Sequence, residues 1–190
     1  MKQESANLTA RESLDIIASM IQEAKGNVQR NNFYFLFWGW IVVIADVGMY
    51  VLTEAGYEHP YAVWLITIPA WIFTLYRGFS RKKTARTTTH FDRISGWLWM
   101  SYGIAIFILV FFGFKIDYQL NPVILIVSAV PTIVSGVILN FRPLMFGGVT
   151  FWIAGIICFL LPKETQPLAG ALGIVSGYLV PGYMLKNKKD

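Results

Sequence analysis

The stretch FLFWGWIVVIADVGMYVLTE, residues 35–54, decides the fold of this chain. Twenty residues of α-helix rise about 30 Å, which is the thickness of the hydrocarbon core of a bilayer. An Asp at the centre of a spanning helix costs about 2.5 to 3.5 kcal/mol on insertion scales, whereas each Leu, Ile, Phe or Val favours insertion by roughly 0.3 to 0.6 kcal/mol. The ten such apolar residues outweigh Asp46, the acid near the centre. The stretch is therefore predicted to be a helix that crosses a membrane.

The composition of the whole chain agrees with a membrane location. Hydrophobic residues make up 55% of the 190 residues and charged residues 14%, and the mean hydropathy is +0.52. This composition leaves too little polar surface to cover a soluble globule of that size. The single cysteine, Cys158, excludes a disulfide framework and a thiolate metal site.

Five more apolar runs follow the first, and short connections join them. They cover about residues 61–76, 94–114, 122–140, 143–161 and 168–185. Each run is long enough to cross a bilayer or nearly so. We therefore predict an all-α membrane protein in which six transmembrane helices, within residues 33–186, form three hairpins.

The first two hairpins share landmarks that indicate an internal repeat. In both returning helices two prolines lie nine residues apart, and Pro69 and Pro131 are the second of each pair. The third hairpin matches this pattern less closely. Three hairpins that enter from the same side imply a pseudosymmetry axis along the membrane normal.

Residues 1–32 are predicted to form a polar lead and a cytoplasmic amphipathic helix. A capping-box pattern begins at Thr9, and apolar residues, Ile17 and Ile21 among them, then recur at spacings of three and four. Such a helix lies along the membrane surface or packs on the cytoplasmic end of the bundle. Alternatively, it is a docking site for another protein.

Residues 77–93 are predicted to form a basic cytoplasmic loop, which includes Arg81, Lys82, Lys83 and Arg86. With the N-terminus in the cytoplasm, fourteen basic residues lie inside and two outside. This asymmetry predicts that both termini are cytoplasmic, since cationic segments resist translocation. The loop is expected to bind anionic lipid headgroups, at roughly 1 kcal/mol per basic residue, and this role accounts for the net charge of +5 without nucleic acid.

Asp46 is the only ionisable residue deep in any predicted span, and no Lys or Arg is expected at its depth. An intramembrane acid is by default a functional candidate that faces the interior of the bundle. It must be protonated, hydrated, or hydrogen-bonded to groups such as Thr67, Ser101, Ser128 or Thr132. Two interpretations remain open, a proton carrier or cation ligand and a satisfied structural hydrogen bond.

Pro69 and Pro131 fall near the middle of their predicted spans. Each proline removes an N–H group and deprives the carbonyl four residues earlier, that of Leu65 or Val127, of its helical partner. Transporters use such broken helices to line binding sites at mid-membrane depth. The prolines are therefore grouped with Asp46 in a hypothetical polar site, although packing kinks are the alternative.

Patterns typical of enzymes are missing. The two histidines, His59 and His90, are predicted on opposite sides of the membrane, and no phosphate-loop or paired-acid spacing occurs. We expect no enzymatic activity, no cofactor and no metal site.

Gly173 and Gly177 form a GxxxG motif, which predicts a close helix contact inside the bundle or, alternatively, between two copies of the chain.

The N-terminal region resembles a family of small bacterial six-span membrane proteins. The residues that carry the resemblance are ESLDIIASMIQEAK, residues 12–25, and NFYFLFWGW, residues 32–40. The resemblance implies a multi-pass protein of the bacterial inner membrane. It implies no activity, substrate or catalytic residue.

Two functions of different classes are consistent with these patterns. The first is a small transporter or channel-like protein with a mid-membrane polar site at Asp46. The second is a membrane-anchored regulatory or scaffold protein that acts through its amphipathic helix and basic loop, with a cytoplasmic protein as its partner. Self-association of the chain is a further expectation in either case.

Overall fold

The structure is a computed structural model of the chain, and it describes residues 33–82 and 90–187. The predicted amphipathic helix with Ile17 and Ile21, and the loop residues Lys83 and Arg86, lie outside the described residues. Arg81 and Lys82 are the last two residues of a helix, so the helical structure extends into the segment predicted to be a loop.

The described residues are almost entirely helical and include no strand. The first helix, Phe33–Glu54, carries Asp46. The elements after it are the 3₁₀-helix η1 (Pro60–Ile66), α2 (Thr67–Lys82), α3 (His90–Phe111), the 3₁₀-helix η2 (Gly113–Ile116), α4 (Leu120–Ile138), α5 (Arg142–Leu160), α6 (Gln166–Ile174), the π-helical turn η3 (Val175–Leu179) and α7 (Val180–Asn187).

Five helices are long and apolar enough to cross a membrane. They are the first helix, Arg93–Phe111 of α3, α4, α5, and the continuous helix Gln166–Asn187 that α6, η3 and α7 form together. The predicted all-helical fold with several long apolar helices is thus confirmed. The remaining predicted span, at about residues 61–76, falls on η1 and the 16-residue α2, which are not among these five helices and together rise about 38 Å.

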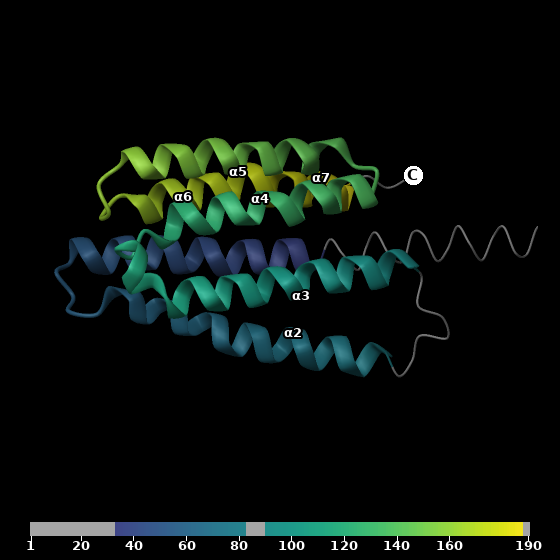
Figure 1. The fold of residues 1–190 in the computed structure, drawn as a ribbon, viewed down its shortest axis with the longest axis horizontal. Helices are drawn as coiled ribbons and strands as arrows, with labels where there is room; N and C mark the ends of the chain where they lie inside the picture. The colour runs from purple at the N-terminus through teal and green to yellow at the C-terminus, as the bar shows by residue number, and fades with distance from the viewer. Residues whose placement is uncertain (1–32, 83–89, 188–190) are drawn as a thin grey trace, which may run out of the picture.

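The helices lie lengthwise beside one another (Figure 1). Residues 55–59, 112–119 and 161–165 connect helices at one end, and residues 139–141 connect α4 to α5 at the other. The first helix is central, since its residues contact four other elements. Phe35 contacts Trp99 of α3, Trp38 contacts Trp71 of α2, Gly48 lies against Val63 of η1, and Gly39 lies against Leu179 of η3.

The tightest packing joins α4, α5 and the last helix. A Cβ added at Gly147 of α5 would collide with the carbonyl of Gly177, and one added at Gly173 would lie 2.8 Å from the Cβ of Ala154. Small residues therefore bring these backbones close together, as is usual between membrane helices. The GxxxG motif of Gly173 and Gly177 makes its contact with α5, inside the bundle.

The π-helical turn η3 ends at Leu179, two residues before Pro181. A proline has no N–H group, so the carbonyl four residues earlier, that of Gly177, loses its usual α-helical partner. A π-turn is one of the ways in which a helix absorbs such a disruption. The turn also places Tyr178 in the core, where its ring contacts those of Phe35 and Phe151.

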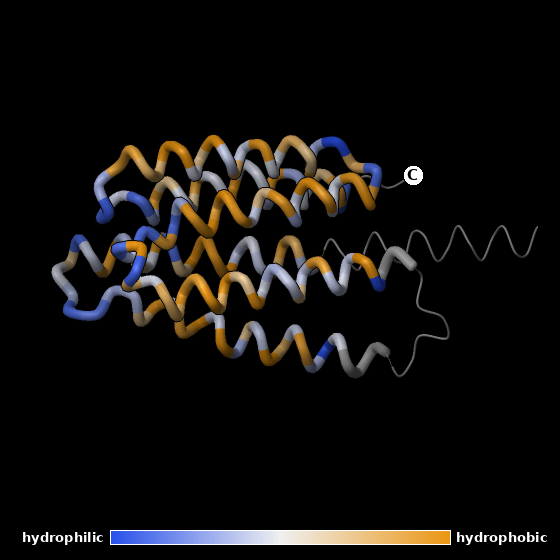
Figure 2. Tube along the Cα trace, viewed as in Figure 1, coloured by the Kyte–Doolittle hydropathy of each residue, from blue (hydrophilic) through white to orange (hydrophobic). Residues whose placement is uncertain are grey.

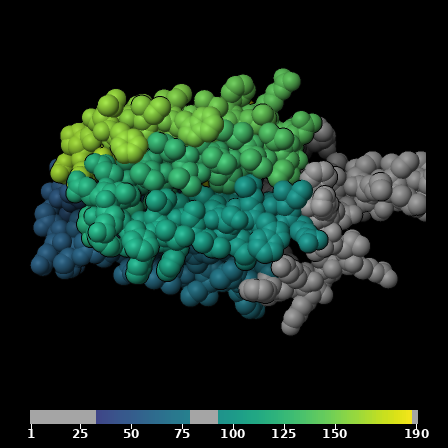
Figure 3. Space-filling view, viewed as in Figure 1, coloured from purple at the N-terminus to yellow at the C-terminus, as the bar shows by residue number. Residues whose placement is uncertain are grey.

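Large apolar side chains cover the outside of the molecule. Figure 2 shows that hydrophobic residues, in orange, recur along the helices. Leu160 is 81% exposed, and Phe107 and Phe146 are each 70% exposed. Seen space-filled in Figure 3, the surface from α3 to α5 is continuous. A soluble monomer rarely exposes so much contiguous apolar surface, whereas a membrane-embedded protein presents it to lipid.

Candidate functional site

Asp46 is buried between helices, with 3% of its surface exposed. Its carboxyl group faces α6 at Gly170, where a Cβ would lie 3.1 Å from Oδ2 of Asp46. Glycine at position 170 therefore leaves the space that the carboxyl group occupies.

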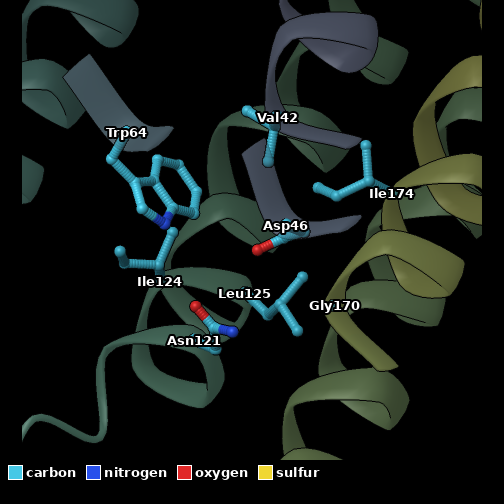
Figure 4. A pocket seen from close by; sticks show the side chains of 8 residues that line it. All are labelled: Val42, Asp46, Trp64, Asn121, Ile124, Leu125, Gly170 and Ile174. Carbon is cyan, nitrogen blue, oxygen red and sulfur yellow. The ribbon is translucent and has the colours of Figure 1, made fainter. Parts of the chain in front are cut away.

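The Asp46 side chain lines a small cavity between the first helix, η1, α4 and α6 (Figure 4). The cavity has a volume of about 20 Å³, and its lining residues are Val42, Asp46, Trp64, Asn121, Ile124, Leu125, Gly170 and Ile174. A volume of this size accommodates roughly one water molecule. We refer to this cavity and its lining as the Asp46 site.

One oxygen of the carboxyl group, Oδ1 of Asp46, is buried and has no hydrogen-bond partner among the described residues. The indole of Trp64 does not supply one, because its Nε1 donates to Sδ of Met49 at 3.3 Å. A buried polar atom without a partner costs free energy, and native structures contain few of them. Such an atom in a cavity with room for a small ligand is a candidate binding group.

No basic residue lines the Asp46 site to neutralise the acid. The salt bridge between Lys163 and Asp117, at 2.6 Å, is exposed and belongs to the connections at the end of the bundle. Groups of three or more His, Cys, Asp or Glu that could hold a metal ion are also missing from the part of the chain that the structure describes.

The Asp46 site lies off the centre of the first helix. Asp46 comes eight residues before Glu54 and thirteen after Phe33, which correspond to about 12 Å and about 20 Å of helix. Along this helix Asp46 is thus nearer to the end that contains residues 55–59, 112–119 and 161–165.

A polar contact separates the Asp46 site from that end of the bundle. Nε2 of Gln166 donates to Oε1 of Gln119 at 2.8 Å and to the carbonyl of Leu161 at 3.3 Å. Gln166 lies one helical turn before Gly170, and Gln119 lies two residues before Asn121. The two amides therefore join the start of α4 to the start of α6 beside the cavity.

The hydroxyl groups predicted to bond Asp46 have other partners or positions. Thr67 donates to the carbonyl of Trp64 at 2.7 Å, and Thr132 donates to that of Ser128 at 2.8 Å. Ser128 donates to the carbonyl of Ile124 and pairs with the hydroxyl of Tyr102, both at 2.6 Å. Ser101 is exposed. Hydroxyl groups in helices commonly bond to a carbonyl one turn earlier, so similar depth in the membrane does not bring them to Asp46.

The two prolines also lie outside the cavity lining. Pro69 is exposed and is the third residue of α2, where the helix has just changed from 3₁₀ to α. The expected free carbonyl of Leu65 is absent, because the N–H of Thr67 bonds to the carbonyls of Leu65 and Trp64. Pro131 is buried inside α4, ten residues or about 15 Å beyond Asn121. Of the predicted site residues, only Asp46 lines the cavity.

Asn121, Trp64 and Gly170 are site residues that the sequence did not reveal. Asn121 precedes Pro122 at the start of an apolar run and looks like an ordinary helix boundary. In the sequence, Trp64 is typical of a residue that anchors a helix at the membrane interface, and Gly170 is typical of a residue that lets helices pack closely. The amide of Asn121 is the one signal that could have been followed, since it is a polar group at the start of a span.

Comparisons with protein-family models, with curated proteins and with solved structures found no match to this chain. The chemistry of the Asp46 site therefore has to be judged from its own residues. The scaffold hypothesis rests on Ile17, Ile21, Arg81, Lys82, Lys83 and Arg86. Only Arg81 and Lys82 lie within the described residues, at the end of α2, so the hypothesis stays a prediction.

Proposed function

We propose that this protein is a small membrane transporter or channel-like protein in which Asp46 binds a small cation during its passage. One observation carries the proposal, namely the buried, unpartnered carboxyl oxygen that faces a cavity between helices. A carboxylate is the natural group to bind a positive charge inside a membrane protein, where acids are costly and mark ion pathways. The proposal includes no catalytic step.

The proposed arrangement has six membrane-crossing segments in the bacterial inner membrane, with η1 and α2 as the second and with both termini cytoplasmic. The distribution of basic residues along the helices supports it. Arg93 lies in the first turn of α3, Arg142 begins α5, and Lys186 lies near the end of α7, all at the end of the bundle opposite Lys115 and Lys163. A basic cytoplasmic end agrees with the positive-inside rule.

Flux through proteoliposomes tests the proposal. Purified protein is reconstituted, a gradient of protons or of a monovalent cation is imposed, and uptake is followed for wild type, Asp46→Asn and Asp117→Asn. Asparagine keeps the size of the side chain but binds no proton and carries no charge, so Asp46→Asn should abolish flux. Asp117 is exposed, so its variant should retain flux.

Wild-type vesicles without flux under any gradient would contradict the proposal. The same holds for an Asp46→Asn variant that conducts as well as wild type. The thermal stability of each variant in detergent, measured beside the flux, shows whether the substituted protein is folded.

A further inference from the structure

The ligands that surround Asp46 are too few for a metal cation. The carboxyl group of Asp46 and the amide of Asn121 are the only polar side-chain groups of the lining besides the indole N–H of Trp64, which is engaged with Met49. Metal cations that leave water need a shell of oxygen atoms: calcium takes six to eight, and potassium filters use rings of carbonyls. The Asp46 site does not offer such a shell among the described residues.

The space available leads to the same conclusion. A cavity of about 20 Å³ has room for roughly one water molecule. A hydrated cation is larger than that, and a dehydrated one would have two side-chain ligands and at most one water. A proton needs no such room, because it becomes part of the carboxyl group.

A neutral carboxyl group also fits the surroundings better than an ionised one. The side chains of Val42, Ile124, Leu125 and Ile174 make the cavity largely apolar, and an isolated charge in such a place is costly. A neutral carboxyl group has one O–H donor and remaining acceptor capacity. The amide of Asn121 lines the same space in Figure 4 and can accept from the O–H group and donate to the other oxygen. One water molecule can do the same.

The protonation of Asp46 is not affected by a charged neighbour among the residues that line the cavity. Trp64 of η1, Asn121 of α4 and Gly170 of α6 are uncharged. Of the neighbouring helices, α5 carries a titratable group, the thiol of Cys158. That thiol is buried and points to the carbonyl of Gln166 at 3.7 Å.

We infer that the cation bound at Asp46 is the proton. This inference rests on the proposed function and names its substrate. Asp46 takes up one proton to become a carboxylic acid and releases it to become a carboxylate, and no other bond forms or breaks. The protein is then a proton carrier or a proton-coupled transporter, and metal cations have no site of their own at Asp46.

Infrared spectroscopy tests this inference independently of transport. A buried neutral carboxyl group gives a carbonyl stretching band that a carboxylate lacks. Wild-type protein in lipid should show such a band at neutral pH, Asp46→Asn should lack it, and Asp117→Asn should retain it. Replacing all sodium and potassium by a bulky organic cation, or adding either metal back, should leave the band unchanged.

A second variant keeps the test decisive if Asp46→Asn does not fold. Asn121→Leu retains the carboxyl group but removes its amide neighbour. The band should therefore persist and shift in frequency, because the hydrogen bond of the neutral acid changes. A band that does not move would show that it does not come from the carboxyl group of Asp46 and would overturn the inference.

The infrared and flux results separate the two claims. Loss of the wild-type band on addition of sodium or potassium at constant pH would show a metal-cation site and overturn the inference, while the transport function could still stand. A persistent band in a protein without flux would overturn the transport function instead. Proton uptake in metal-free vesicles, lost in Asp46→Asn, would support both.

Discussion

The two halves of this bundle, η1 to α3 on one side of the first helix and α4 to the last helix on the other, are built differently. In Arg142–Leu160 and Gln166–Asn187, glycines let backbones touch, and 56% of the residues in the apolar 18-residue stretch of Gln166–Asn187 are buried. In the apolar window of α3 no residue is buried, and a Cβ added at Gly96 would meet nothing within 4 Å. Lipid is as apolar as a leucine side chain, so helices associate in a membrane only where their surfaces fit closely. The contrast indicates that apolar residues suit a helix to the membrane, whereas small residues allow it to pack closely against another helix.

The Asp46 site lies where these two halves meet. Trp64 comes from η1 on the loosely packed side, whereas Asn121 and Gly170 come from the tightly packed α4 and α6. The first helix runs between them and carries Asp46.

The largest expected effect is the loss of a core ring. Phe151 of α5 is 1% exposed, so Phe151→Ala should lower stability by about 3 to 5 kcal/mol through the cavity that it leaves. Phe107→Ala in α3 is the matched control, since its ring is 70% exposed, and it should change stability by less than about 0.5 kcal/mol. Denaturation in mixed micelles measures both. Equal losses for the two variants would refute the contrast between the halves.

Adding one methyl group tests the close approach of the backbones. Gly147→Ala would place a Cβ against the carbonyl of Gly177, and overpacking of this kind costs about 1 to 3 kcal/mol. Gly96→Ala is the control, because its Cβ has open space and alanine favours a helix. Thermal melting in detergent should therefore rank Gly147→Ala well below Gly96→Ala. The reverse order would show that α5 and the last helix are not in such contact.

The smallest expected effect concerns a polar link between the halves. The hydroxyl of Tyr102 in α3 pairs with that of Ser128 in α4 at 2.6 Å. Tyr102→Phe should cost about 0.6 kcal/mol, the average for hydrogen bonds between membrane helices, because Ser128 keeps its bond to the carbonyl of Ile124. Tyr118→Phe, at an exposed position, should be neutral. A double-mutant cycle with Ser128→Ala measures the link, and a coupling energy of zero would remove it.

The limits of the helices could be predicted only in part. The apolar run 94–114 marks one span, but α3 begins at His90 and ends at Phe111. A helix continues beyond the apolar residues because backbone hydrogen bonds do not depend on hydropathy, and α3 therefore begins before its apolar run. It ends before that run does, because the chain turns into η2 at Gly113 while the sequence is still apolar.

The residues of the candidate site could also be predicted only in part. Asp46 could be identified because it is the one ionisable residue in a long apolar run, and the transfer cost of an acid is a property of that run alone. Pro69, Pro131, Ser101 and Ser128 could not be ruled out, because their depths are similar to that of Asp46 while their directions are unknown from a single segment.

The sequence by itself determined that this is a helical protein with several apolar segments long enough to cross a membrane and with one acid deep in such a segment. Both follow from transfer energies that add up locally along the chain. Only the tertiary structure decided that Asn121, Trp64 and Gly170 surround Asp46. Which helix faces meet depends on close packing between segments far apart in the chain, and no single segment contains that information.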